Sequence, residues 1–80
     1  MDILKAYQEW LDHEYKDAER AIKLFRSWTT PKEIVNSTLQ RALGVFFFIQ
    51  HLGFDITYQE LEATYESFKE KVEKLIDKQS

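Results

Sequence analysis

The side chains best spaced to do chemistry are Glu9, His13 and Asp17, which recur at every fourth position near the N-terminus. On a helix this spacing places them on one face, where carboxylate and imidazole groups could bind a metal ion. The apolar residues of the same segment fall on the opposite face, so we expect all three side chains to point to solvent. Neither histidine follows a glutamate by three residues, as in di-metal helical bundles. We therefore predict no metal site.

Other catalytic patterns are also missing from the sequence. The chain contains no cysteine, and its two glycines, Gly44 and Gly53, cannot form a phosphate-binding loop. Arg41 and His51 are further apart than the arginine and histidine of small helical ribonucleases. We predict that the protein is not an enzyme and that it requires no cofactor.

Glu14 falls within the apolar arc of the first predicted helix, where a hydrophobic residue is expected. A buried carboxylate is costly unless it is paired or hydrogen-bonded. Counting from the predicted turns places Glu14 level with Val45 and Tyr65. The Tyr65 hydroxyl is therefore the first candidate donor in a buried polar pair, with Arg41 or a histidine as alternatives. In another interpretation, Glu14 reaches solvent at the edge of the apolar stripe.

The size and charge of the chain limit the classes of function. Eighty residues make one small domain, here predicted to span residues 1–80. The net charge of -3 and the lack of a basic cluster disfavour nucleic-acid binding. The longest apolar run is far shorter than the roughly 20 residues of a membrane span, and the first residues lack the pattern of a signal peptide. We expect a soluble, cytoplasmic protein that does not bind membranes.

Two capping signals divide the chain into helices. Thr30 precedes Pro31 and is followed three residues later by Glu33, while Thr57 and Glu60 repeat the threonine–glutamate spacing. Just upstream of the second signal, a glycine can take the left-handed conformation that ends a helix. We predict helices over residues 2–28, 31–52 and 58–77.

Apolar residues recur three and four positions apart in each predicted helix, which gives each one an apolar stripe. The stripes comprise Leu4, Tyr7, Leu11, Ala18, Ala21, Phe25 and Trp28; Val35, Leu39, Ala42, Phe46 and Ile49; and Tyr58, Leu61, Tyr65, Phe68, Val72 and Leu75. The connections are short, so consecutive helices should be antiparallel neighbours. The predicted fold is all-α, an up-down-up antiparallel three-helix bundle with a long first helix.

Five consecutive apolar residues, 45–49, cannot all face one side of a helix with 3.6 residues per turn. A helical wheel places Phe48 nearly opposite the predicted core, on a second face that also contains Gly44. We call this face the outer strip. It comprises Ile34, Ser37, Arg41, Gly44, Phe47, Phe48, His51 and Leu52.

A glycine one turn before an exposed phenylalanine would allow another backbone to approach closely. We hypothesise that the outer strip is an interface, with a homodimer as the first expectation because two-fold dimers are the commonest oligomers. The same surface would suit a different protein partner. In the simpler interpretation, Phe48 is tolerated in solvent, since single exposed apolar residues are common.

The function most consistent with these features is a small interaction or regulatory protein. One alternative is a binder of small apolar ligands, with a pocket lined by Phe46, Phe47, Trp10 and Trp28. Another is an inhibitor of the immunity or antitoxin kind, in which an acidic helical module covers a basic partner.

Overall fold

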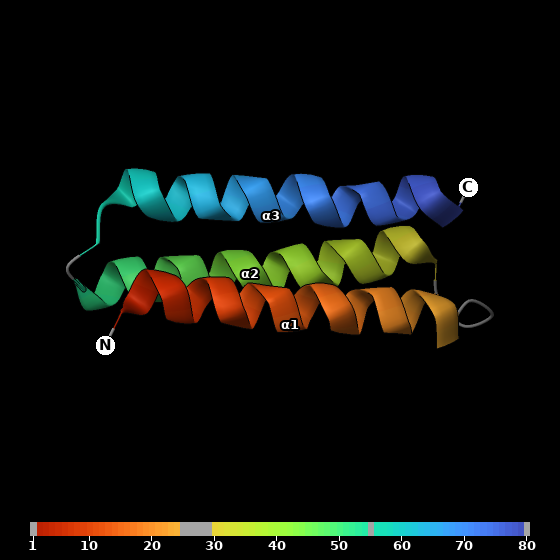
Figure 1. Ribbon diagram of the computed structural model, residues 1–80, viewed down its shortest axis with the longest axis horizontal. Coiled ribbons are helices and arrows are strands. Elements are labelled where there is room, and N and C mark those ends of the chain that lie inside the picture. Colours follow the sequence, from red (N-terminus) through yellow and green to blue (C-terminus); the bar gives the residue numbers. More distant parts are fainter. Residues whose placement is uncertain (1, 25–29, 55, 80) are drawn as a thin grey trace.

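The computed structural model describes residues 2–24, 30–54 and 56–79, with side chains as far as Asp77. Over these residues the chain forms three α-helices, α1 (Ile3–Leu24), α2 (Pro31–Leu52) and α3 (Tyr58–Gln79). They run up, down and up along a rod of 43 × 17 × 17 Å, and each helix packs against the other two (Figure 1). The predicted all-α, antiparallel three-helix bundle is confirmed.

The three helices have the same length of 22 residues each. The first helix is therefore no longer than the others in the described part of the chain. Residues 25–28, which were predicted to extend it, lie outside the described residues. At the other end, α3 continues to Gln79, two residues beyond the predicted end.

Both predicted capping boxes are confirmed. The Glu33 amide donates to Oγ1 of Thr30 at 3.2 Å, and the Thr30 amide donates to the Glu33 carboxylate at 3.3 Å. Thr57 and Glu60 make the same reciprocal pair at 3.1 and 3.3 Å. Each box satisfies two backbone amides at a helix start, which fixes where α2 and α3 begin.

Gly53 ends α2 in the left-handed conformation, with φ 72° and ψ 33°, and its amide donates to the Gln50 carbonyl. A side chain at this position would crowd the following carbonyl, which is why glycine is favoured there. The left-handed residue turns the chain sharply, so α3 can return alongside α2.

The core lies along the axis of the rod, between the three helices. Its buried members are Tyr7, Leu11, Ala18, Ile22, Val35, Thr38, Ala42, Phe46, Ile49, Leu61, Phe68, Val72 and Leu75. The predicted stripes contain all of these except Ile22 and Thr38.

The differences from the predicted core have simple physical causes. Ile22 is 1% exposed, whereas its predicted neighbour Ala21 is only half-buried. Thr38 is buried because its hydroxyl donates to the Ile34 carbonyl of the preceding turn at 2.9 Å, which satisfies the polar group within its own helix. Tyr58 was predicted to face inward but is 51% exposed, because it lies at the very start of α3.

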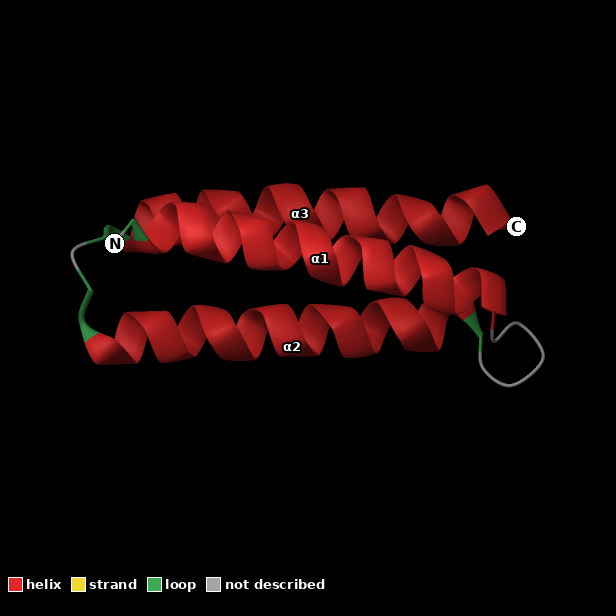
Figure 2. Cartoon of the chain, turned by 60° about the horizontal axis from the view of Figure 1, so that its bottom comes forward, coloured by secondary structure: helices red, strands yellow, loops and turns green. Residues whose placement is uncertain are grey.

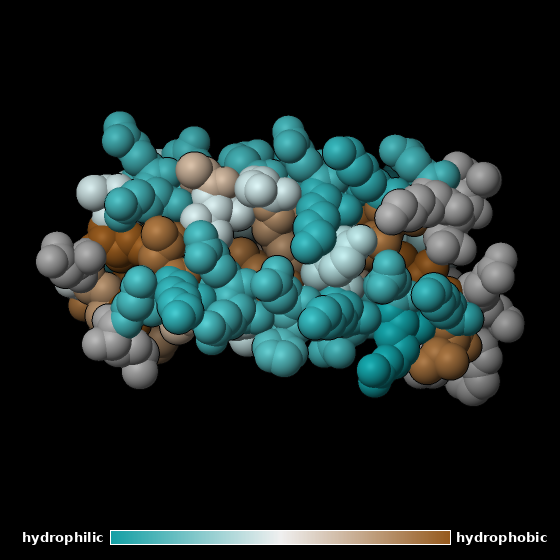
Figure 3. All heavy atoms as spheres, viewed as in Figure 1, coloured by the Kyte–Doolittle hydropathy of each residue, from teal (hydrophilic) through white to brown (hydrophobic). Residues whose placement is uncertain are grey.

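The face formed by α1 and α3 is mostly hydrophilic, with apolar atoms visible chiefly in the seam between the helices (Figure 3). A second view places α2 along one edge of the bundle, where no other helix covers its outward side (Figure 2). Within the described residues, no helix is long and apolar enough to cross a membrane.

Candidate functional site

The apolar run in α2 divides between the core and the surface. Phe46 and Ile49 are 3% and 7% exposed, whereas Phe47 and Phe48 are 54% and 62% exposed. Leu52, one turn beyond Phe48, is half exposed as well. Water therefore contacts three large apolar side chains in the last two turns of α2.

Phe47 and Phe48 differ in their surroundings. The ring of Phe47 packs edge-to-face on Phe46 at 5.4 Å between centroids, and Phe46 also contacts the rings of Tyr58 and Tyr65. Phe47 is therefore the outer member of an aromatic cluster that joins α2 to α3. Phe48 has no aromatic ring contact among the described residues, and it is the more exposed of the two.

Gly44 lies one turn before Phe48 on the same face. A Cβ atom built at Gly44 would meet no atom of this chain within 4 Å, apart from its own helix backbone. The packing of the monomer therefore gives no reason for glycine here, although glycine in a helix interior costs about 1 kcal/mol relative to alanine. The missing side chain leaves a gap on the surface between Phe48 and the preceding turn.

The N-terminal half of the outer strip has a different character. Ser37 is exposed, Ile34 is half-buried against the core, and Arg41 is occupied by a contact to α1. At the C-terminal end, His51 is exposed beside Phe48 and Leu52. The exposed large apolar side chains of the outer strip are thus confined to the C-terminal half of α2.

The partner of Glu14 is Arg41. Nε and Nη2 of Arg41 each donate to one Glu14 carboxylate oxygen, both at 3.2 Å. Within the described residues no hydrogen bond joins Glu14 to Tyr65, so the predicted Glu14–Tyr65 pair is corrected to the alternative that named Arg41. The Glu14 side chain is 13% exposed and that of Arg41 is 52% exposed, so the pair lies at the edge of the core.

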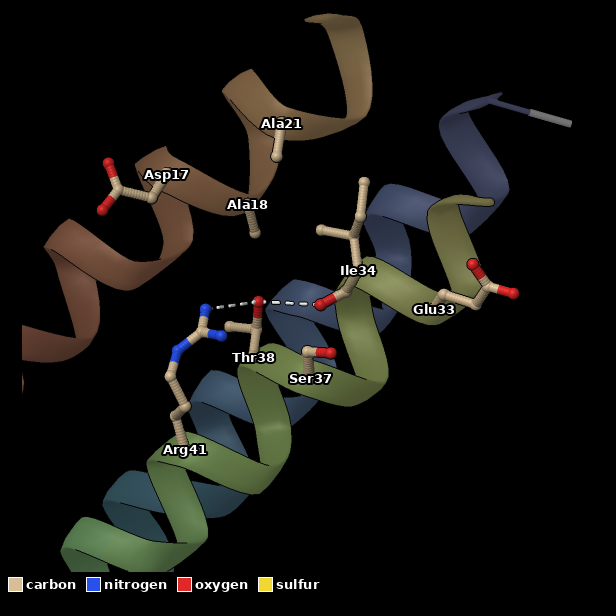
Figure 4. Close-up of a pocket in the computed structure, with 8 residues that line it drawn as sticks. All are labelled: Asp17, Ala18, Ala21, Glu33, Ile34, Ser37, Thr38 and Arg41. Atoms are coloured by element: carbon tan, nitrogen blue, oxygen red, sulfur yellow. Dashed lines mark hydrogen bonds between the residues drawn. The ribbon is translucent and has the colours of Figure 1, made fainter. Parts of the chain in front are cut away.

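A second bond extends this contact into the core. Nη2 of Arg41 also donates to the buried Thr38 hydroxyl at 3.4 Å, and Thr38 in turn donates to the Ile34 carbonyl (Figure 4). These bonds form a polar chain along the seam between α1 and α2. They hold the guanidinium in place and orient it along α2.

An open hollow of about 440 Å³ lies beside this polar chain. Its walls are largely small side chains, including Ala18, Ala21 and Ser37, and the carboxylates of Asp17 and Glu33 point away from it (Figure 4). The hollow has neither aromatic walls nor convergent charges. This hollow was not predicted from the sequence, although small residues on facing helices are a signal for such a site.

The structure describes three of the four aromatic residues that were proposed to line an apolar pocket. Phe46 is buried in the aromatic cluster with Phe47 packed on it, and Trp10 stacks on Tyr7 at 6.3 Å between ring centroids. Trp28 lies outside the described residues. The three described rings are thus each packed against another ring.

The titratable groups of the core have structural partners. The buried Tyr7 hydroxyl donates to the Ala42 carbonyl at 2.9 Å, which links α1 to α2. Burial, with a smaller contribution from Tyr65, raises the pKa of Tyr7 well above its ordinary value. Burial also raises the pKa of Tyr65.

The possible metal ligands on α1 are exposed on the surface of the helix. Glu9, His13 and Asp17 are all exposed on the outer side of α1. In the part of the chain that the structure describes, no group of three or more His, Asp or Glu side chains could hold a metal ion.

Comparison with models of known protein families, with curated proteins and with solved structures finds no match to this chain.

Proposed function

We propose that the protein is a small, non-enzymatic interaction module that acts through the outer strip of α2, first of all by pairing with a second copy. The observation that carries this proposal is the exposure of Phe48, at 62%, beside a glycine that the monomer does not need. Burying one exposed phenylalanine contributes on the order of 2 kcal/mol, so contact at this face is favourable.

The position of the apolar residues also supports an interface. Apart from Leu24, every exposed large hydrophobic residue among the described positions lies between residues 47 and 58. Scattered apolar residues on a surface need no explanation, but a group of neighbours is typical of an interaction site. An 80-residue domain also buries a relatively small share of its surface alone and gains stability from association.

The two alternative functions have less support. A binder of small apolar ligands needs a cavity, whereas Phe46 and Phe47, two of the residues suggested for it, pack against each other, and Trp10 stacks on Tyr7. An acidic inhibitor needs a concentrated acidic surface, whereas the exposed group on α2 is apolar and the net charge is only -3.

Sedimentation equilibrium from about 1 μM to about 1 mM tests the proposal. The wild type should associate, and Phe48→Glu should be a folded monomer, because a carboxylate placed in an apolar interface loses its hydration. Leu24→Glu is the matched control, since Leu24 is 65% exposed on α1 at the other end of the rod. It should associate as the wild type does. A wild type that remains monomeric at the highest concentration would contradict the proposal.

A further inference from the structure

The outer strip carries a large side chain and a gap one turn apart. Phe48 extends from α2 with 62% of its surface exposed, and four residues earlier Gly44 has no side chain. Residues four apart on a helix lie one above the other on the same face. The surface therefore presents a projecting ring one helical turn from a position where the backbone has no side chain over it, so another chain can approach the backbone closely there.

This arrangement has a direct consequence for pairing by two-fold symmetry. In an isologous contact, residue i of one copy meets residue j of the other, and j meets i in return. If two α2 helices pack antiparallel with the two-fold axis level with residue 46, position 44 of each lies opposite position 48 of the other. Each Phe48 ring then fills the gap at the other copy's Gly44.

The charge of the segment is compatible with self-pairing. None of residues 42–54 is Asp, Glu, Lys or Arg, although these types make up 31% of the chain. A two-fold contact brings equivalent surfaces together, so a surface of one charge sign repels itself. Residues 42–54 carry no such charge, so two copies of the segment do not repel each other. A partner that recognises this surface by its charge would need charged residues in it.

The exposed apolar area suits a weak dimer that forms with rising concentration. Phe47, Phe48 and Leu52 lie in the half of α2 where the contact is centred, and each is between 50% and 62% exposed. Taking about 200 Å² for a fully exposed large apolar side chain, the three expose on the order of 300 Å². Two copies together provide about 700 Å², so polar atoms around these side chains must supply the rest of the roughly 1,000 Å² that a specific interface needs.

From these observations we infer that the outer strip binds a second copy of this chain, in an antiparallel α2–α2 contact that places Phe48 of each copy over Gly44 of the other. This inference rests on the proposed function and specifies its partner and geometry. In this geometry Arg41 lies opposite His51 of the other copy, at the edge of the contact, and its guanidinium is bound to Glu14 of its own chain.

Disulfide trapping tests the geometry, because the chain has no cysteine of its own. Gly44→Cys and Phe48→Cys proteins are mixed in equal amounts, oxidised gently, and the products identified by mass spectrometry. The mixed 44–48 disulfide should exceed the share that random pairing of the two proteins would give. In the mixed dimer the two thiols face each other, and the second Phe48–Gly44 contact stays intact. If 44–44 or 48–48 disulfides equal or exceed it, the antiparallel geometry is wrong.

Filling the gap gives a second, independent test. Gly44→Gln should keep its helical circular dichroism, because nothing in the monomer occupies the space at Gly44. Its dimer dissociation constant should rise by at least about tenfold. Ser37→Gln adds a side chain to the same face two turns away and should change the constant by less than about twofold.

The outcomes separate the two proposals. If Phe48→Glu abolishes association but Gly44→Gln associates as the wild type does, the outer strip is an interface and the inferred geometry is wrong. If the wild type is monomeric throughout, the second copy is excluded and the proposed function fails with it.

Discussion

Glu14 of α1 and Arg41 of α2 form an ion pair, and the two side chains differ in their exposure to water. The Glu14 side chain is 13% exposed, whereas that of Arg41 is 52% exposed. A guanidinium that loses its partner can turn to solvent at this position, but a nearly buried carboxylate cannot. Because leaving a buried charged group without hydrogen bonds costs more than losing an exposed ion pair, the two residues should respond differently to substitution.

We predict that Arg41→Met lowers the free energy of unfolding by about 1–3 kcal/mol, since it leaves the Glu14 carboxylate without its two donors. Glu14→Met should stay within about 1 kcal/mol of the wild type, because Arg41 remains half solvated and the methionine adds apolar contact. Urea denaturation at one low protein concentration measures both. A Glu14→Met loss as large as that of Arg41→Met would show that the guanidinium also depends on the pair.

Tyr7 gives a second residue-level prediction, in its dependence on pH. Its hydroxyl donates to the Ala42 carbonyl, and burial raises its pKa above the ordinary value of about 10. The unfolded chain therefore loses this proton at a lower pH than the folded chain does. The contribution of the protonated Tyr7 hydroxyl to the stability of the folded chain is therefore fully present below about pH 10 and is lost as the pH rises further.

Near neutral pH, Tyr7→Phe should cost about 1 kcal/mol for the lost hydrogen bond. The difference between the wild type and Tyr7→Phe should stay constant from about pH 8 to about pH 9.5 and shrink from about pH 10 to about pH 11, because only the wild type carries the titrating hydroxyl at this position. Urea denaturation of both proteins across this range measures the difference, in which effects of Tyr65 and the lysines largely cancel. A difference that stays constant over the range would contradict the assigned role of Tyr7.

At the scale of the helices, the two glycines have opposite roles. Gly53 holds φ 72° at the end of α2, whereas Gly44 lies within the helix with open space around it. In a Phe48→Glu background, where association does not enter, Gly44→Ala should raise the free energy of unfolding by about 1 kcal/mol. Gly53→Ala should lower it by about 1–2 kcal/mol, the cost of a left-handed residue with a Cβ. Thermal or urea unfolding of the two variants measures both changes in the free energy of unfolding. Equal effects of Gly44→Ala and Gly53→Ala would contradict the opposite roles of the two glycines.

The helix starts and the turn between α2 and α3 could be predicted because their causes are local. Thr30, Thr57 and Gly53 act on backbone groups within a few residues, so the sequence pattern contains the whole interaction. The same holds for the exposure of Phe48, which follows from helical periodicity once the opposite face is assigned to the core. Local rules of this kind predicted most of the fold.

What the sequence could not settle depends on contacts between helices. Ala21 and Ile22 are three and four residues after Ala18, and only the packing of α1 decides which one is buried. The partner of Glu14 depends on how α1 and α2 are aligned along the bundle axis, which decides that Arg41 lies within reach of its carboxylate. Such offsets are set by side-chain packing along the seam, which no short pattern records.

For the whole molecule, the exposed apolar surface is concentrated toward one end of a 43 Å rod, where α2 ends and α3 begins. If this surface pairs with a second copy, folding and association are linked, because only folded chains bind one another. The melting temperature of the wild type should then rise with protein concentration, by roughly 5–10 °C for each hundredfold while the folded chains are mostly dimeric. Phe48→Glu should melt at a temperature independent of concentration, and Leu24→Glu should follow the wild type. Differential scanning calorimetry at several concentrations provides the comparison. If the melting temperature of the wild type does not change with protein concentration, the stability is determined within the single bundle and Phe48 contributes nothing by association.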